Sequence, residues 1–248
     1  MAGSTVLLVD CGETSMELLA ARIGRLGLRV LRAKTASDAY VAVSDGRLAV
    51  GAVVIPPDAP FADLGKGLAR FREVASEPNL SVAVAGARPG AMRGTVSAGA
   101  LAAAGVDFAI YEPIDAHALR FQLNRATAWR HSRQERRADR APFVGEVRIR
   151  AGRRNKEGRL YTLSSHGAFI SLPAPCLRGT ELKLEIALPD GALVRAKGRV
   201  AMTNVRGNLQ KKALPVGMGI VFQGLKSNAQ ARVALAVRDR LEALDVGC

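Results

Sequence analysis

The stretch VLLVDCGETSMELLAARIGRLGLRVLRA (residues 6–33) contains the repeating unit from which the first half of the chain is built. A short apolar run, TVLLVD, is followed by apolar residues at helical spacing from Met16 to Leu26, and then by a second apolar run, LRVLRA. Thr14 and Glu17 form a capping box at the predicted helix start. A buried strand that alternates with an amphipathic helix is typical of parallel β/α proteins.

The same alternation continues to about residue 130. Three further strands are predicted at AVGAVVI, LSVAVAG and VDFAIY, and further helices near 37–44, 62–75, 91–104 and 115–130. Five β/α units with short connections predict an α/β fold with a doubly wound parallel five-stranded sheet, because each crossover helix must lie on a face of the sheet. A binding site is expected at the carboxyl ends of the strands.

The second half of the chain has a period of two. Strand-length pieces are FVGEVRIRAG, GRLYTLSS, GAFISLP, GTELKLEIALPDG, ALVRAKGRVAMTNV and PVGMGIVFQGL, separated by Gly, Pro and Asn. They predict an all-β antiparallel barrel or sandwich, followed by a helix at 228–244. The polar, basic segment HSRQERRADRAP predicts a linker. The predicted divisions are a domain at 1–129, a linker at 130–141 and a barrel domain with a C-terminal helix at 142–248.

Charge is divided unequally between the two halves of this 248-residue chain, whose formal net charge is +14. Residues 1–129 carry 13 Lys or Arg and 12 Asp or Glu, whereas residues 130–248 carry 23 and 10. This asymmetry indicates that the two domains have different partners. An acidic protein or an anionic lipid would match the basic half. Nucleic acid is the weakest of these partners, because the half offers no interleaved aromatic side chains for stacking.

The remaining composition excludes several classes of protein. The three cysteines are too far apart for a disulfide framework or a metal site. No apolar run approaches the roughly 18 residues of a membrane span, and the first residues are typical of a strand rather than a signal peptide, so a cytoplasmic location without a transmembrane segment is expected. No nucleophile, base and orienting group occur at a recognisable spacing, so no catalytic residue, no cofactor and no enzymatic activity are predicted.

The first half resembles the response-regulator receiver family over about residues 4–128, in the order of its elements and in the string at 6–33. That family holds Mg²⁺ with two acids after the first strand and accepts phosphate on an Asp that ends the third strand. It also uses a Thr or Ser after the fourth strand, and a Lys before a Pro after the fifth.

Only one of these chemical groups is present here, namely Asp10. The other positions hold Cys11, Pro56 with Pro57, Gly86, and Glu112 before Pro113. Mg²⁺ needs several oxygen ligands, and Glu112 adds negative charge where the family has a cation. We therefore predict a pseudo-receiver with no phosphoacceptor and no metal site, which serves as a docking surface or forms a homodimer. Asp58, two residues beyond the acceptor position, is interpreted as a loop residue.

The second half, from residue 135 to about 244, resembles the PilZ family through ERRADR, YTLSSHGAFI and GMGIVF. That family has an Arg-x-x-x-Arg segment before the barrel and an Asp/Asn-x-Ser-x-x-Gly turn after an early strand. The residues that correspond to these two segments are Arg136, Arg137, Arg140, Thr162, Ser164 and Gly167. The chain departs from the family at Thr162, which stands in the Asp/Asn position.

The resemblance implies that cyclic di-GMP binds between the linker and the barrel, commonly as a stacked dimer. Guanidinium groups can stack on guanine and form forked hydrogen bonds to its edge or to phosphate. Ser164 would donate to a phosphate, and Gly167 would allow a close backbone approach. The hydroxyl of Thr162 would replace a charged or amide group, and the loss of a charge-assisted bond costs about 1.5 to 3 kcal/mol.

Two functions follow from these patterns. The first is a bacterial signalling effector that binds cyclic di-GMP and relays it by protein–protein interaction, in motility or surface behaviour. The second is an adaptor in which both domains bind proteins without any ligand, which the Thr162 departure favours.

Overall fold

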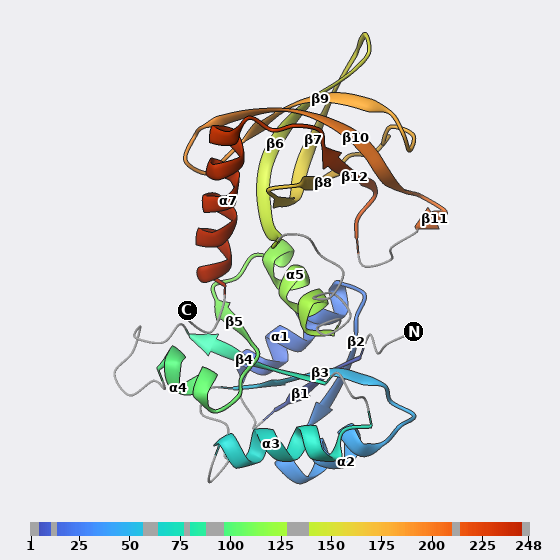
Figure 1. Cartoon of the computed structure of the whole chain (residues 1–248). Helices are drawn as coiled ribbons and strands as arrows, with labels where there is room; N and C mark the ends of the chain where they lie inside the picture. The colour runs from blue at the N-terminus through green and yellow to red at the C-terminus, as the bar shows by residue number, and fades with distance from the viewer. Residues whose placement is uncertain are drawn as a thin grey trace. The chain divides into compact units, whose positions relative to one another are not determined.

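The computed structural model describes residues 5–10, 14–56, 64–76, 80–87, 97–127, 139–209 and 214–244. The chain forms two compact units, shown in Figure 1. We call Met1–Glu135 with Glu242–Cys248 the N-terminal unit, and Arg136–Leu241 the barrel unit.

The N-terminal unit alternates strands with helices. Its elements are β1 (Thr5–Val9), α1 (Thr14–Arg25), β2 (Arg29–Ala33), α2 (Ala36–Ser44), β3 (Val50–Ile55), α3 (Leu64–Val74), β4 (Ser81–Ala87), α4 (Ala98–Ala103), β5 (Phe108–Glu112) and α5 (Ala116–Thr127). The strands pair in parallel in the order β2-β1-β3-β4-β5. This confirms the predicted doubly wound sheet. The predicted helix at 91–104 corresponds to α4, and 91–96 lie outside the described residues.

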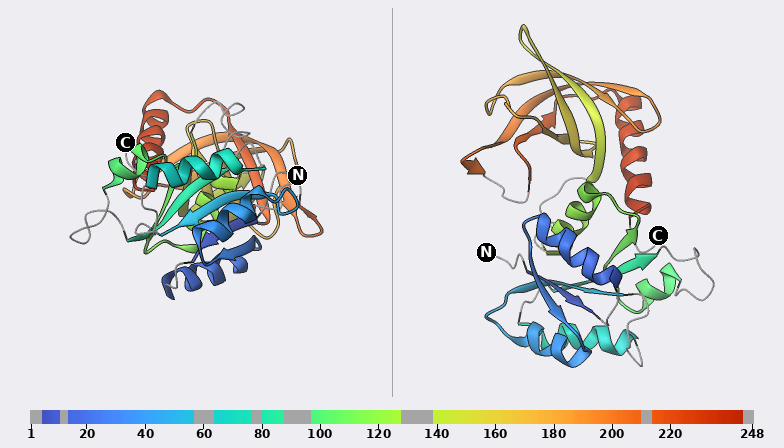
Figure 2. Two further views of the ribbon diagram at one scale, coloured as in Figure 1. Left: turned by 90° about the horizontal axis from the view of Figure 1, so that it is seen from below. Right: turned by 180° about the vertical axis from the view of Figure 1, so that it is seen from behind.

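Each face of this sheet has its own helices, as the views in Figure 2 show. α1 and α5 cover one face, where Ile23 and Leu119 belong to the same core as Val54. α2 and α3 cover the other face, where Phe71 belongs to the same core as Val53. All five side chains are fully buried, and burying a side chain of this size contributes about 1.5 to 3 kcal/mol. The continuous apolar runs of the strands result from burial on both faces.

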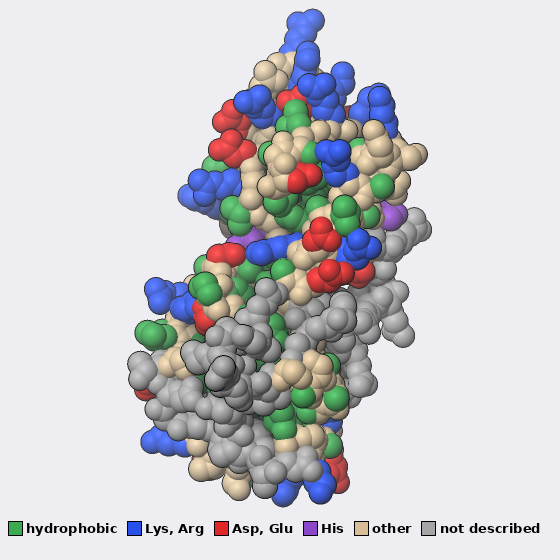
Figure 3. All heavy atoms as spheres, turned by 90° about the vertical axis from the view of Figure 1, so that its left-hand side faces the viewer, with side chains coloured by type: hydrophobic (Ala, Val, Ile, Leu, Met, Phe, Trp, Pro, Cys, Tyr) green, Lys and Arg blue, Asp and Glu red, His purple; other side chains and the backbone are tan. Residues whose placement is uncertain are grey.

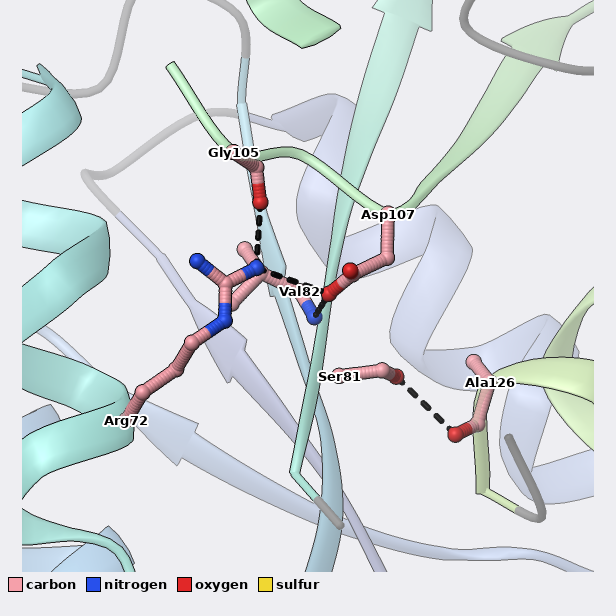
Figure 4. Close-up of polar contacts among 6 residues, drawn as sticks. All are labelled: Arg72, Ser81, Val82, Gly105, Asp107 and Ala126. Atoms are coloured by element: carbon pink, nitrogen blue, oxygen red, sulfur yellow. Dashed lines mark hydrogen bonds and ion pairs between the residues drawn. The ribbon is translucent and has the colours of Figure 1, made fainter. Parts of the chain in front are cut away.

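The amino ends of β4 and β5 are held by polar contacts, which Figure 4 shows. Asp107 precedes β5 and accepts a hydrogen bond from the backbone N–H of Val82 at 2.9 Å. Its carboxylate also pairs with Arg72 of α3 at 3.0 Å. Nearby, Ser81 Oγ donates to the carbonyl of Ala126 in α5 at 2.9 Å. These contacts tie α3 and α5 to the edge of the sheet opposite the carboxyl ends of the strands.

In its described residues, the barrel unit consists of antiparallel strands followed by a helix. Its elements are β6 (Ala141–Ala151), β7 (Arg154–Ser164), β8 (Gly167–Ser171), β9 (Glu181–Ala187), β10 (Leu193–Val205), β11 (Asn208–Leu209), β12 (Gly217–Phe222) and α7 (Ser227–Glu242). Six strands pair in the order β10-β12-β8-β7-β6-β9, and β9 pairs again with β10. The ring is therefore closed, which confirms the predicted barrel.

The barrel core is formed by the inward residues of these strands and by α7. Val233 and Val237 of α7 are buried in the same core as the strand residues. Leu244, just after α7, belongs instead to the core of the N-terminal unit, and its carbonyl accepts a hydrogen bond from Gln122 Nε2 at 2.7 Å. Glu242–Cys248 therefore group with the N-terminal unit, although the sequence analysis placed them with the barrel. Within the described part of the chain, no helix combines the length and apolar character needed to cross a membrane.

Candidate functional site

The Ser-Gly turn predicted from the sequence joins β7 to β8. Ser164 ends β7, Gly167 begins β8, and the two residues are paired across the hairpin. Ser165 and His166 form the turn between them. The side chain of His166 is exposed, and its Nδ1 lies 2.9 Å from Ser165 Oγ. The tip of this turn is thus accessible to a ligand.

Thr162 and Ser164 lie on the outer face of the barrel. A bulge between Leu160 and Thr162 interrupts the alternation of β7, and as a result Leu160 and Leu163 both belong to the barrel core. Thr162 and Ser164 flank Leu163 and therefore point away from that core. Both residues are nevertheless buried, with exposed fractions of 4% and 3%. The two motif hydroxyls share one face and lie beneath its surface.

The hydroxyl of Ser164 already has a hydrogen-bond partner within the turn. Its Oγ donates to the carbonyl oxygen of Gly167 at 3.0 Å. A serine hydroxyl has a single proton to donate. Donation to a phosphate, which the family resemblance implies, would require this hydroxyl to rotate away from Gly167.

Gly167 is needed because another strand of the barrel passes directly beside it. A Cβ at this position would lie 2.2 Å from the carbonyl oxygen of Ile220 in β12. No such contact is tolerated between these atoms, and the carbonyl belongs to the backbone of a paired strand. The close backbone approach expected at Gly167 is therefore made by β12 of the same barrel.

Arg140 brings a guanidinium group to the same outer face. Its Nη1 lies 3.4 Å from Thr162 Oγ1. The register explains the approach, since Arg140 immediately precedes β6 and Pro142 of β6 pairs with Thr162. Arg140 is half-buried. The other two predicted ligand residues of the linker, Arg136 and Arg137, lie outside the described residues.

An aromatic ring that the sequence analysis did not single out lies beside these residues. Phe169 of β8 pairs with Thr162. It points to the outer face, because its neighbours Ala168 and Ile170 belong to the barrel core. The ring is buried and meets that of Tyr161 edge-on, with centroids 5.8 Å apart. The signal in the sequence is a large apolar residue at an outward position of GAFIS, where a polar residue is more usual.

Asp10 is the one acid of the receiver pattern that is present in the N-terminal unit. Its charge is neutralised by an arginine at the carboxyl ends of the parallel strands. Asp10 follows β1 and is buried. Arg32 of β2 donates to its carboxylate and pairs also with Glu17 of α1 at 3.1 Å. The hydrogen bonds that Arg32 donates to Asp10, and then to Glu17, raise the pKa of Arg32 above its ordinary value. A cation of the protein therefore lies against the one acid that matches the receiver pattern.

Glu112 stands where the receiver pattern has a Lys, and its negative charge is paired with an arginine of α1. Arg22 Nη1 pairs with Glu112 Oε1 at 2.5 Å, and the same guanidinium donates to the carbonyl of Ile114. Pro56, which stands near the acceptor position, is buried after β3. Gly86 lies within β4 and, having no side chain, brings no hydroxyl to this edge. Further predicted positions outside the described residues are Cys11, Pro57 and Asp58.

Comparison with known families identifies the barrel unit. Residues 133–238 match the family model of the PilZ domain. The chain thus carries a PilZ domain, built as a closed six-stranded barrel with a C-terminal helix, after a receiver-like β/α unit. No curated protein was found to match the chain.

Solved structures similar to parts of the chain include representatives of both folds. The inhibitor of motility MotI/DgrA from Bacillus subtilis is 19% identical over 44% of this chain, with a TM-score of 0.38, and the match spans 52% of that protein, about half its length. The PilZ domain of YcgR from Escherichia coli, with c-di-GMP, is 15% identical over 44% of this chain and 94% of its own, with a TM-score of 0.36. A response regulator receiver domain from Clostridium thermocellum is 16% identical over 51% of this chain and 96% of its own, with a TM-score of 0.41. The assignment of the barrel unit rests on the family match.

Proposed function

We propose that the barrel unit binds cyclic di-GMP on its outer face, beside the turn between β7 and β8. The observation that carries the proposal is the guanidinium of Arg140 at 3.4 Å from Thr162 Oγ1, next to the Ser164 turn. It lies in a unit that matches the PilZ domain. The chain is then a cytoplasmic, non-enzymatic signalling effector, which relays the ligand to a protein partner in motility or surface behaviour.

The arrangement suits a ligand that combines guanine bases with phosphates. Arg140 can stack on a base or form a forked hydrogen bond with it, which a lysine cannot do equally well. Arg136 and Arg137 precede it in the chain and would supply further guanidinium groups over the ligand. Thr162 offers one hydroxyl to a guanine edge, and Ser164 offers a second once it leaves the carbonyl of Gly167.

Titration calorimetry of the full chain with cyclic di-GMP tests the proposal. We expect saturable binding by the wild type and its loss in the double variant Arg136→Ala, Arg140→Ala. A double variant of exposed arginines elsewhere in the barrel unit, Arg178→Ala with Arg206→Ala, should bind as the wild type does. Absence of heat from the wild type at micromolar concentrations would overturn the proposal.

A second candidate function is a ligand-independent adaptor. The hydrogen bond from Ser164 to Gly167 and the hydroxyl at position 162 favour it, because both reduce the polar groups offered to a nucleotide. In that case the double variant at Arg136 and Arg140 would capture the same protein partners as the wild type. Equal capture together with no calorimetric signal would establish the adaptor over the effector.

For the N-terminal unit we propose a pseudo-receiver that acts by docking or by forming a homodimer. Its support is the pairing of Asp10 with Arg32 and of Glu112 with Arg22. Incubation with acetyl phosphate and Mg²⁺, followed by mass spectrometry of the intact chain, should show no added phosphate. Stoichiometric phosphorylation at Asp58 or at any other carboxylate of the unit would refute this assignment.

A further inference from the structure

A row of three cations crosses the barrel where β6, β9 and β10 lie side by side. Arg150 of β6 is directly opposite Lys183 of β9, and Lys183 is directly opposite Lys197 of β10. All three residues are exposed. Side chains in such positions have Cβ atoms about 4.5 to 5.5 Å apart, and like charges there are destabilising. We call these three residues the cationic row.

The adjacent row on the same strands is also rich in arginine. Arg148 is opposite Glu185, and Glu185 is opposite Arg195. Arg195 Nε pairs with Glu185 Oε1 at 2.9 Å. Arg148 is in turn opposite Glu157 of β7. Two carboxylates therefore alternate with two guanidinium groups in this row, and the excess positive charge lies in the cationic row beside it.

A pocket of about 1230 Å³ includes both rows in its lining and extends to Lys226 and Arg232, near the start of α7. The lining contains eight Lys or Arg residues and two Glu residues. Figure 3 shows many Lys and Arg side chains on the part of the surface that the barrel unit forms. None of these pocket residues belongs to the Arg140, Thr162 and Ser164 group, so this face is separate from the proposed nucleotide site.

The other residues of the lining indicate what kind of anion fits. Leu193 and Ala229 add apolar side chains, and Leu193 is 54% exposed. None of the described lining residues is aromatic, so the face offers no platform for stacking nucleic-acid bases. A hollow of this size also differs from the convex, apolar surface that inserts into a flat bilayer. A segment with both carboxylates and apolar side chains would use every part of the lining.

We propose that this face docks an acidic segment of a partner protein. Its carboxylates pair with the arginines and with the cationic row. Forked arginine–carboxylate hydrogen bonds would fix the orientation of the bound segment. Its apolar side chains lie against Leu193 and Ala229. The role of this contact as the output of the relay rests on the proposed function, whereas the binding itself requires no cyclic di-GMP.

Fluorescence anisotropy with the full chain tests the docking face. The probe is a fluorescein-labelled peptide of repeating Glu-Glu-Leu units, compared with one in which Gln replaces Glu and one in which Ser replaces Leu. We expect binding of the first peptide and at least about tenfold weaker binding of the other two. The affinity should fall as NaCl is raised from about 0.05 to 0.3 M, because screening shortens the reach of exposed charges.

Charge reversal locates the binding on the barrel. The variant Lys183→Glu, Lys197→Glu should weaken peptide binding at least about tenfold. The control Arg178→Glu, Arg206→Glu changes the net charge equally at exposed positions outside this pocket, and should bind within about twofold of the wild type. Equal losses in both variants, or no binding of the peptide by the wild type, would overturn the proposal.

Two further measurements separate this proposal from its alternatives. The first is binding to a random DNA duplex, or to vesicles of phosphatidylglycerol and phosphatidylcholine. If either binds more tightly than the peptide and depends equally on Lys183 and Lys197, the partner of this face is nucleic acid or lipid and the proposal is wrong. Calorimetry with cyclic di-GMP should give the same result for Lys183→Glu, Lys197→Glu as for the wild type. If the peptide binds but cyclic di-GMP does not, the proposed function is wrong and the docking face is still supported.

Discussion

The guanidinium of Arg32 on β2 donates to the carboxylate of Asp10 at the end of β1. Asp10 stands where the receiver pattern has one of two acids, and here a side chain of the chain itself brings a positive charge to it. The charge of this buried carboxylate is therefore balanced within the unit. The pair links the carboxyl ends of β1 and β2 and contributes to the stability of this edge of the sheet.

Replacing Arg32 by Ala should lower the midpoint of urea unfolding, because buried Asp10 loses its charged donor. The pKa of Arg32 is raised, so its contribution is present below its ordinary pKa and is lost only as the pH rises through the raised value. The difference between wild type and Arg32→Ala should thus be equal at about pH 6 and pH 9. Arg29→Ala, on the same strand and exposed, should change little. A difference that disappears at the higher pH would contradict this account.

Replacing Gly167 by Ala should destabilise the barrel unit by about 1 to 3 kcal/mol or more, because the new Cβ would meet the backbone carbonyl of Ile220. Gly24→Ala is the matched control. Its Cβ has no neighbour within 4 Å on helix α1, so it should stabilise by about 0.5 to 1 kcal/mol. Thermal unfolding of both variants provides the comparison, and an unchanged midpoint for Gly167→Ala would disprove the close approach of β12.

Replacing Thr162 by Asp should increase the affinity for cyclic di-GMP about ten- to hundredfold, since a charge-assisted hydrogen bond contributes about 1.5 to 3 kcal/mol. Arg140, at 3.4 Å from the present hydroxyl, would partly neutralise the new carboxylate. Thr162→Ser keeps one hydroxyl and should bind as the wild type does. Calorimetry measures all three proteins, and equal affinities for Asp and Thr would argue against ligand contact at this position.

Replacing Asp107 by Ala should destabilise the N-terminal unit by about 1 to 3 kcal/mol, because Val82 loses its acceptor and Arg72 loses its ion pair, keeping only its bond to the carbonyl of Gly105. Asp107→Asn keeps a side-chain oxygen for Val82 and should be less destabilising. Urea unfolding distinguishes the two variants. If Asn were as destabilising as Ala, the ion pair with Arg72 would be the dominant contact.

Replacing Lys183 by Glu should stabilise the barrel unit by about 0.2 to 1 kcal/mol, because Lys183 lies between two like charges in the cationic row. The gain should shrink at high salt. Arg178→Glu is the control and should have little effect. If Lys183→Glu were less stable than the wild type, repulsion among the three cations would not be destabilising the barrel unit.

The alternation of strands and helices in the N-terminal unit was predictable because its buried strands are continuous apolar runs. The beginning of β7 was not. Strand β7 starts at Arg154, whereas the pattern predicted a start at Gly158, because residues 154–157 are all polar although they pair with residues 148–151 of β6. Pairing across a hairpin decides such a segment, and no periodicity of apolar residues reveals it.

For the candidate site, the resemblance supplied the positions but not their surroundings. A regular alternation from Leu160 would put Thr162 inside the barrel, and the bulge between them reverses this. The need for glycine at position 167 comes from β12, more than fifty residues along the chain. Arg32 received no role from the sequence, because its contact with Asp10 depends on the pairing of β2 with β1.

The second pairing of β9, with β10 as well as with β6, has a consequence for how any protein can join the barrel. Each of the six strands of the ring pairs with a neighbouring strand on both sides over part of its length. No strand of the ring is therefore an edge strand along its whole length, which disfavours extension of the ring by an incoming strand. Selectivity on this unit then comes mainly from the side chains it displays, which makes partner choice adjustable by surface substitutions that leave the hydrogen-bonded frame intact.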